Sequence, residues 1–298
     1  MSGISSMMFA NFAAPAAGAE ADVNTKILLH FDGANASTTI TNSVTGGIAF
    51  TKGSNSLTYL QTAEKKFGTA AWFCNSPSGS GPGNNSGIYP TTKTLANGTW
   101  IPRDFWLDKD WTAEAQVYIR PNTAGGQLCI WWGIGTPRFN AGFWNTNSGA
   151  GMTFQVEMST NGTYTPGNNG GAGYYNIVWT IGNSILNTWA HVALVRTGDA
   201  LKLFINGTDQ GLGLLTPYGT GGGQGGTGRT SANIFLSGNP YLGTGSGLVT
   251  GNLAIADVGG PYTDYGFRRS YMDEFRFGNG IARYTANFTA PTSAFPDV

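Results

Sequence analysis

Residues 189–207 read WAHVALVRTGDALKLFING, and this stretch has the pattern of a β-hairpin. Residues 190–196 and 201–205 are predicted strands, since both are short apolar runs bounded by turn residues. Residues 196–199 join them at the distance expected of a hairpin, and Asn206-Gly207 ends the second strand. Asn-Gly favours a turn with positive φ, which matches the twist of paired strands. The stretch therefore predicts an antiparallel sheet.

On both sides of this hairpin, apolar and polar residues alternate with a period of two residues. Strong helical periodicity does not occur. Residues 112–119 and 152–158 alternate cleanly between apolar and polar, which is typical of half-buried antiparallel strands. Further strands are predicted at 27–31, 70–73, 128–134, 174–181, 234–236 and 271–277. We read the Gly-rich stretches 76–87 and 211–228 as surface loops of one domain. The pattern predicts an all-β fold, an antiparallel jelly-roll β-sandwich, without internal repeats or coiled-coil heptads.

Composition narrows the class of protein. Charged residues make up only 11% of the 298 residues, yet the chain has 9 Trp, 12 Tyr and 17 Phe. Such a chain folds, because disordered chains are rich in charge and poor in aromatics. The net charge is zero and no basic run occurs, so nucleic acid is not an expected partner. No apolar run approaches the ~20 residues that span a bilayer, so membrane insertion is not expected either.

Residues 1–22 differ from the rest and are predicted to form a short extended arm outside the domain at 23–298. Residues 1–19 contain no charged side chain, and they lack the positive start of a secretory signal. Five apolar residues are the expected assembly anchor: Ile4, Met7, Met8, Phe9 and Phe12. Burial of such side chains can offset the entropy of ordering an arm most easily when several copies dock together, so a homo-oligomer is expected. The alternative is that the arm folds back onto its own domain.

Cys74 and Cys129 are the two cysteines of the chain. Two cysteines in a chain of this length do not make a disulfide scaffold. We favour two buried thiols, with a single disulfide as the alternative.

Several segments, in order over residues 26–296, resemble the laminin-G-like branch of the concanavalin-A-like lectin and glucanase superfamily. They are ILLHFDG at 27–33, KFGTAA at 66–71, WTAEAQVY at 111–118, the hairpin at 189–207, and MDEFRF at 272–277. The closing ARYTANFTAP, residues 282–291, is most similar to bacteriophage virion proteins of this family. The resemblance implies a laminin-G-like jelly roll over residues 23–298.

For function, the resemblance implies a non-enzymatic bacteriophage structural protein on the virion surface, of the capsid-decoration or head-fibre type. Its partners would be other virion proteins, contacted through the N-terminal arm. The alternative is a tail-associated lectin module that binds a host surface glycan. The fold alone does not decide between the two.

Enzymatic activity is not expected. Glycosidases of this superfamily carry closely spaced carboxylates on one strand, because the acid and the nucleophile must face the same sugar ring. Glu64, Glu114, Glu157 and Glu274 are instead scattered singly. The two histidines, His30 and His191, lie in separate predicted strands. His191 shares a strand face with Trp189, and the resemblance gives that pair a packing and hydrogen-bonding role.

Asp32 and Asp273 are the candidate metal ligands. They lie on the first and last predicted strands, which pair in such sandwiches, and some members of the family hold a structural calcium in this region. Calcium needs ~6–8 oxygen ligands, many of which can be backbone carbonyls. The simpler interpretation, which we favour, is that Asp32 caps the turn before Gly33 and Asp273 pairs with a neighbouring arginine.

Aromatic residues in two loops are the candidate glycan contacts. The pair Trp131-Trp132 and the run Phe143-Trp144-Asn145 would offer aromatic rings to the face of a pyranose. The alternative is that these aromatics belong to the core, as most aromatics in a sandwich do.

Overall fold

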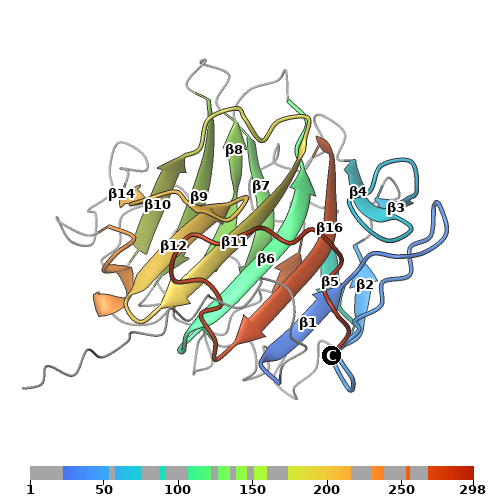
Figure 1. Ribbon diagram of the computed structural model, residues 1–298, viewed down its shortest axis with the longest axis horizontal. Coiled ribbons are helices and arrows are strands. Elements are labelled where there is room, and N and C mark those ends of the chain that lie inside the picture. Colours follow the sequence, from blue (N-terminus) through green and yellow to red (C-terminus); the bar gives the residue numbers. More distant parts are fainter. Residues whose placement is uncertain are drawn as a thin grey trace, which may run out of the picture.

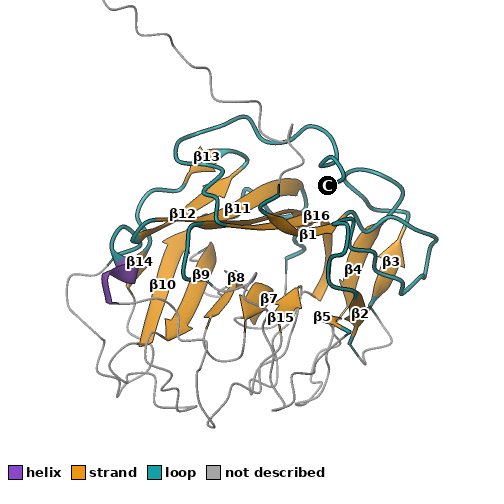
Figure 2. Ribbon diagram, turned by 90° about the horizontal axis from the view of Figure 1, so that it is seen from below, coloured by secondary structure: helices purple, strands orange, loops and turns teal. Residues whose placement is uncertain are grey.

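The computed structural model describes residues 23–53, 58–75, 87–91, 107–121, 127–134, 139–145, 151–159, 174–215, 230–237, 253–255 and 268–298. Two antiparallel sheets stack face to face as a β-sandwich (Figures 1 and 2). The described part contains a single short 3-10 helix, Ile234–Ser237, and no helix long enough to cross a bilayer. The predicted all-β jelly-roll class is confirmed. The arm at residues 1–22 lies outside the described residues.

Sheet A follows the order β13-β12-β11-β6-β16-β4-β3, and β1 also pairs with β16. Its strands are β1 (Thr25–Leu29), β3 (Tyr59–Gln61), β4 (Ala71–Asn75), β6 (Trp111–Tyr118), β11 (Trp189–Thr197), β12 (Ala200–Ile205), β13 (Thr208–Asp209) and β16 (Arg268–Asn279). The pairing of the first long strand with the last, with Leu29 opposite Phe275, is as expected.

Sheet B follows the order β14-β10-β9-β8-β7-β15-β5-β2. Its strands are β2 (Phe50–Lys52), β5 (Ile88–Pro90), β7 (Gln127–Ile134), β8 (Phe139–Asn145), β9 (Met152–Ser159), β10 (Tyr174–Thr180), β14 (Leu214–Leu215) and β15 (Leu253–Ile255).

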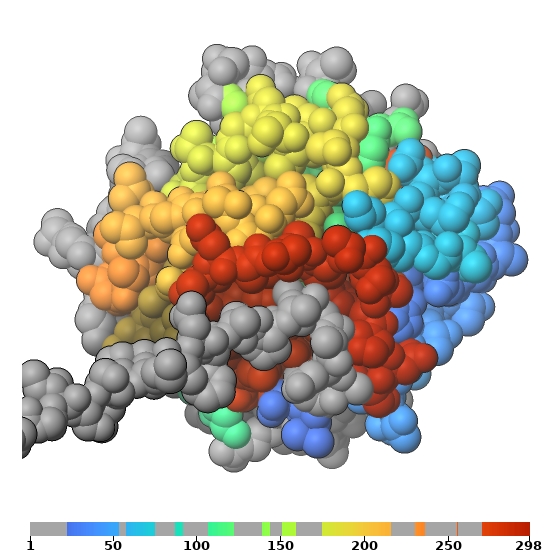
Figure 3. Space-filling view, in the orientation of Figure 1, coloured from blue at the N-terminus to red at the C-terminus, as the bar shows by residue number. Residues whose placement is uncertain are grey.

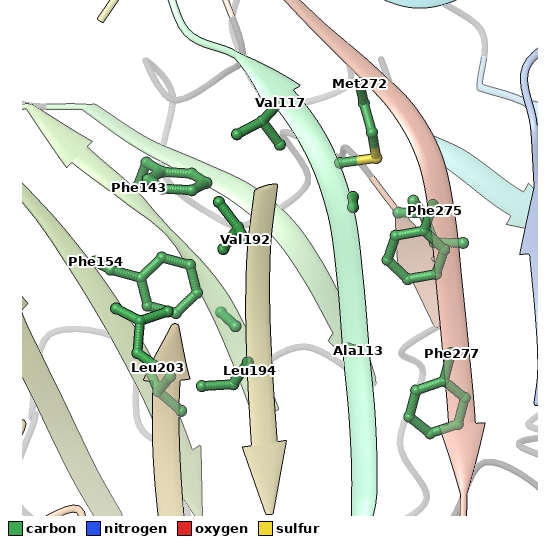
Figure 4. Packing of buried hydrophobic residues seen from close by; sticks show 14 of the residues in the cluster. Ala113, Val117, Phe143, Phe154, Val192, Leu194, Leu203, Met272, Phe275 and Phe277 are labelled. Atoms are coloured by element: carbon green, nitrogen blue, oxygen red, sulfur yellow. The ribbon is translucent and has the colours of Figure 1, made fainter. Parts of the chain in front are cut away.

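The core fills the space between the sheets with alternate residues of each strand. In Figure 4, Phe143 and Phe154 of sheet B face Val192 and Leu194 of sheet A. The two phenylalanines meet edge to face, with ring centroids 5.0 Å apart. Between the sheets, Trp111 of β6 meets Phe139 of β8 edge to face at 5.5 Å, and because aromatic side chains bury the most apolar area, such contacts are a main source of the attraction between the sheets.

A C-terminal segment, residues 280–298, crosses the outer face of sheet A (Figures 1 and 2). Tyr284 and Phe288 stack on each other at 3.6 Å and cover Phe204 of β12. The Asn206-Gly207 turn adopts positive φ at both residues, as the sequence predicts. Gly207 is required here also because a Cβ atom would collide with the backbone of Phe288. The segment therefore closes one part of a face that would otherwise expose apolar groups.

The long predicted strands form, with boundaries that differ by up to three residues. The prediction for residues 234–236 was wrong, since they form the 3-10 helix, where Ile234 and Phe235 are buried by tertiary contacts. Phe143, Trp144 and Asn145, expected in a loop, belong to the strand Phe139–Asn145. Cys74 is buried in the core, while the side chain of Cys129 lies outside the described part.

Candidate functional site

The outer face of sheet A carries aromatic side chains on five adjacent strands. Leu60, Trp72, Val117, Ala190 and Met272 point into the core, so the residue next to each of them points outward. We call the resulting set the aromatic row; in spatial order it consists of Tyr59, Phe73, Tyr271, Tyr118 and Trp189.

The register of the sheet makes this row straight. Each member lies directly opposite the next one on the neighbouring strand. Successive ring centroids are 5.5, 4.9, 5.8 and 5.8 Å apart. Four steps of about 4.8 Å between strands give a row roughly 19 Å long. Phe73 and Tyr271 in the row are 8% and 4% exposed, whereas Tyr59, Tyr118 and Trp189 are half-buried and reach the surface.

Polar groups border the row. The indole Nε1 of Trp189 donates to Glu64 Oε1 at 2.9 Å. The guanidinium of Arg120 lies 5.5 Å from the ring centroid of Tyr271 and 5.9 Å from that of Tyr118, and it also donates to the Tyr271 hydroxyl at 3.5 Å. Burial raises the pKa of Tyr271, although the charge of Arg120 opposes this. The arrangement combines ring faces with donors and acceptors at their edges.

The loop between β3 and β4, residues 62–70, runs beside the row. Asp273 Oδ2 accepts the backbone N–H groups of Lys66 at 2.8 Å and Phe67 at 3.0 Å. Asp32 accepts the backbone N–H and the hydroxyl of Thr69. Gly68 lies between these anchors with φ +55°, and a Cβ atom there would collide with the Asp32 carboxylate. One carboxylate that follows β1 and another on β16 therefore hold this turn.

This geometry revises the details expected for Asp32 and Asp273. Asp273 binds the loop amides and makes no arginine pair among the described residues, and Asp32 binds Thr69 rather than capping the turn before Gly33. Burial raises the pKa of Asp273 to about 7, while the amides of Phe67 and Lys66 oppose that rise. Its Oδ1 has no hydrogen-bond partner in the described part of the chain. Calcium at this pair remains a prediction. Within the described ranges, no three His, Cys, Asp or Glu residues group as metal ligands.

A second polar cluster, centred on Glu114, lies beneath the C-terminal segment. Glu114 Oε1 accepts from Arg276 Nε at 2.8 Å, while Oε2 lies 3.0 Å from His191 Nε2 and accepts from the Tyr284 hydroxyl at 2.8 Å. Burial alone would raise the pKa of Glu114, but the charge of Arg276 and the hydrogen bond with His191 lower it to about 2. Burial next to Glu114 raises the pKa of Tyr284.

The Glu114 cluster is suited to holding the chain rather than to catalysis. Glu114 is 0% exposed and stays ionised, so it neither reaches a substrate nor carries a proton to donate. The packing and hydrogen-bonding role expected of His191 is confirmed by its contact with Glu114.

The end of the C-terminal segment is fastened by a third cluster. Glu274 lies 2.9 Å from His30 Nδ1 and accepts the backbone N–H of Phe295 at 2.8 Å. His30 Nε2 lies 3.1 Å from Asp297, and the guanidinium of Arg276 lies 3.9 Å above the Phe295 ring. The hydrogen bond to Glu274 raises the pKa of His30 to about 9, against the opposing effect of burial. These contacts fix the segment over sheet A.

The residues expected to bind glycan lie in strands of sheet B; Trp131 lies in the strand predicted at 128–134, whereas Phe143, Trp144 and Asn145 were expected in a loop. Phe143 is 1% exposed and packs in the core, so the prediction of a sugar contact there was wrong. Trp131 belongs to β7, while Trp144 and Asn145 belong to β8; their side chains lie outside the described part. Glu157 is buried opposite Asn140 and Asn176 on the same sheet.

The sequence gives little sign of the aromatic row, because its members come from five separate segments. Only the register of strands far apart in the sequence aligns them. A weak signal is present at Tyr118 and Trp189, each of which occupies an outward position at the end of a strongly patterned strand.

No model of a known protein family and no curated protein matches the sequence. Solved structures match its fold at low identity. Domain 4 of a GH43 extracellular arabinanase from Geobacillus stearothermophilus, in complex with arabinotriose, is 15% identical with a TM-score of 0.47; the match covers 87% of this chain and 94% of that one. The binding domain of botulinum neurotoxin DC, in complex with rat synaptotagmin II, is 10% identical with a TM-score of 0.46, over 86% of this chain and 48% of that one.

A Trypanosoma rangeli sialidase in complex with sialic acid is 12% identical with a TM-score of 0.44. The match covers 87% of this chain but only 31% of the sialidase. At these identities the likeness extends no further than the β-sandwich architecture.

Proposed function

We propose that this protein is a non-enzymatic carbohydrate-binding domain, and that the aromatic row is its sugar-binding surface. The observation that carries the proposal is the alignment of five rings across five strands, with Glu64 and Arg120 beside them.

The chemistry of a sugar matches such a surface. The C–H groups on one face of a pyranose pack on an aromatic ring, while the hydroxyl groups at its rim need donors and acceptors. The half-buried rings of Tyr59, Tyr118 and Trp189 offer apolar contact. The carboxylate of Glu64 can accept from hydroxyl groups, and the guanidinium of Arg120 can donate to them. A strand spacing of about 4.8 Å is close to the length of one sugar in an extended chain, so neighbouring sugars can meet neighbouring rings.

Binding without hydrolysis is the simpler function for this surface. Cleavage needs an acid and a base or nucleophile on opposite sides of one glycosidic bond. Glu64 at the row is partly exposed, whereas Asp273 is 0% exposed beneath the loop, so these two carboxylates cannot flank one glycosidic bond.

The proposal is tested by titrating the full chain with a panel of oligosaccharides in a calorimeter, together with three variants. Trp189→Ala and Tyr118→Ala should each weaken binding about tenfold or more, since each removes an aromatic contact worth ~1.4 kcal/mol or more. Leu214→Ala is the matched control, because this exposed side chain belongs to an edge strand of sheet B. Row variants that bind like the wild type, or a panel without any ligand, would refute the proposal.

We also propose that the domain is displayed on a virion surface and anchored by residues 1–22, as the sequence resemblance suggests. A sugar-binding face favours the tail-associated receptor-binding role over pure capsid decoration, because only the former needs a host glycan. Deletion of residues 2–19 should leave a soluble, equally stable domain that no longer joins the particle. A truncated chain that still incorporates would contradict the anchoring role. One that aggregates would instead favour an arm folded back on its own domain.

A further inference from the structure

We infer that the aromatic row binds an acidic polysaccharide, a chain of pyranose rings that carry anionic groups, in preference to a neutral glycan. This inference rests on the proposed function and adds the chemical class of the ligand.

Three exposed cations lie near the row, and none of them forms an ion pair with a carboxylate of the described residues. Arg120, Lys65 and Lys66 are all exposed. The guanidinium of Arg120 contacts two tyrosine rings and a tyrosine hydroxyl, but no carboxylate of the described residues. Lys65 Nζ donates to the carbonyl of Thr62, and Lys66 Nζ lies 5.6 Å from the ring centroid of Phe67. All three charges can therefore pair with a ligand.

The two lysines are held near the row by the loop that carries them. Residue 64, just before them, bonds to Trp189 at one end of the row. The backbone amides of residues 66 and 67 bond to Asp273, two residues along β16 from Tyr271. The loop thus spans the sheet alongside the rings, so its lysines lie on one side of a bound chain.

The three cations outnumber the two carboxylates of this region that are not fully buried, Glu64 and Asp32. Glu64 accepts from the Trp189 indole, and Asp273 is buried beneath the loop amides. Burial also raises the pKa of Asp273 to about 7, so this side chain is only partly ionised near neutral pH.

Arg120 is the side chain best placed to bind the anionic group of an acidic sugar. Its planar guanidinium is positioned over the Tyr118 and Tyr271 rings by cation–π contacts, so little freedom is lost when it pairs. A carboxylate on a sugar that packs against these rings can accept two parallel N–H bonds from it.

Single-stranded nucleic acid is the competing ligand, because bases also stack on aromatic rings beside cations. We favour the glycan because the chain lacks the basic surplus that a phosphate backbone attracts.

The test is calorimetric titration of the full chain with four probes: an oligogalacturonate, its methyl ester, a sulfated oligosaccharide and a thymidine oligonucleotide. The ester removes the charge and keeps the sugar rings. We expect an acidic oligosaccharide, carboxylated or sulfated, to bind at least about tenfold more tightly than the ester, and added salt to reduce this preference. The tighter of the two acidic probes identifies the anionic group.

Two variants test whether Arg120 is responsible for the preference for the acid over the ester. Arg120→Ala should bring acid and ester to similar affinity, while Lys26→Ala, which removes a half-buried lysine on β1, should change neither affinity. Equal binding of acid and ester by the wild type would overturn this inference and leave the proposed function intact. Tighter binding of the oligonucleotide would also overturn it. If no oligosaccharide binds, the proposed function itself fails.

Discussion

At the scale of single residues, the outer face of sheet A separates charges that hold the chain from charges that can meet a ligand. Glu114, Arg276 and His191 are buried together under the C-terminal segment. Arg120 and Glu64 lie at the aromatic row, where sugars could reach them. The space-filling view shows the C-terminal segment in red across this face, bordered by residues of the 174–215 stretch in yellow and of the 58–75 stretch in cyan (Figure 3).

Glu114→Gln should destabilise the protein by about 3–5 kcal/mol, because it leaves the buried Arg276 without its carboxylate. Urea unfolding of the purified variant measures this loss. The matched control, Glu64→Gln, removes a charge at the row and should change stability by about 1 kcal/mol or less. If both variants unfold at the urea concentration of the wild type, the Glu114 cluster is not what fastens the segment.

His30 should make stability depend on pH in the alkaline range. Its pKa rises from 6.5 to about 9 on folding, chiefly through the hydrogen bond to Glu274. Protonated His30 therefore stabilises the fold fully below about pH 6.5, and this contribution is lost as the pH rises through about 9. Melting temperatures of the wild type should fall over that interval more steeply than those of His30→Gln. Parallel curves for the two proteins would show that His30 does not fasten the C-terminal end.

At the scale of elements, the long strands could be predicted and the short ones could not. β6 and β9 alternate strongly, so their own residues specify both strand and face, and β11 is recognisable as an apolar run between turn residues. Strands of two or three residues, such as β3 and β5, carry too little pattern and exist only because a partner strand is present. At residues 234–236 a strand was predicted where none forms, because this buried apolar run belongs to a 3-10 helix.

The β3–β4 loop provides the test of the predicted calcium. Asp273 Oδ1 has no partner within the described residues, so an ion could bind there, and ion binding would favour the ionised carboxylate. If calcium occupies this pair, a chelator should lower the melting temperature of the wild type, and Asp273→Ala should abolish that sensitivity. An unchanged melting curve in chelator would assign Asp32 and Asp273 to holding the loop alone.

At the scale of the whole molecule, the sequence predicts the sandwich but not its binding face. Alternation, turn residues and the order of family-like segments all point to one fold, because each long strand carries its own signal. The aromatic row depends instead on the register between strands that are distant in sequence, which no local pattern encodes. For the same reason the sequence wrongly predicted a glycan contact at Phe143, which is buried in the core.

The central claim is that sugars bind at the row on sheet A rather than at the sequence-predicted tryptophans of sheet B. Fluorine NMR of the fluorotryptophan-labelled protein tests this most directly, with resonances assigned by single Trp→Phe substitutions. On addition of an oligogalacturonate, the Trp189 resonance should shift, while the resonances of Trp131 and Trp144 should stay unchanged. A shift at Trp131 or Trp144 with Trp189 unchanged would contradict it.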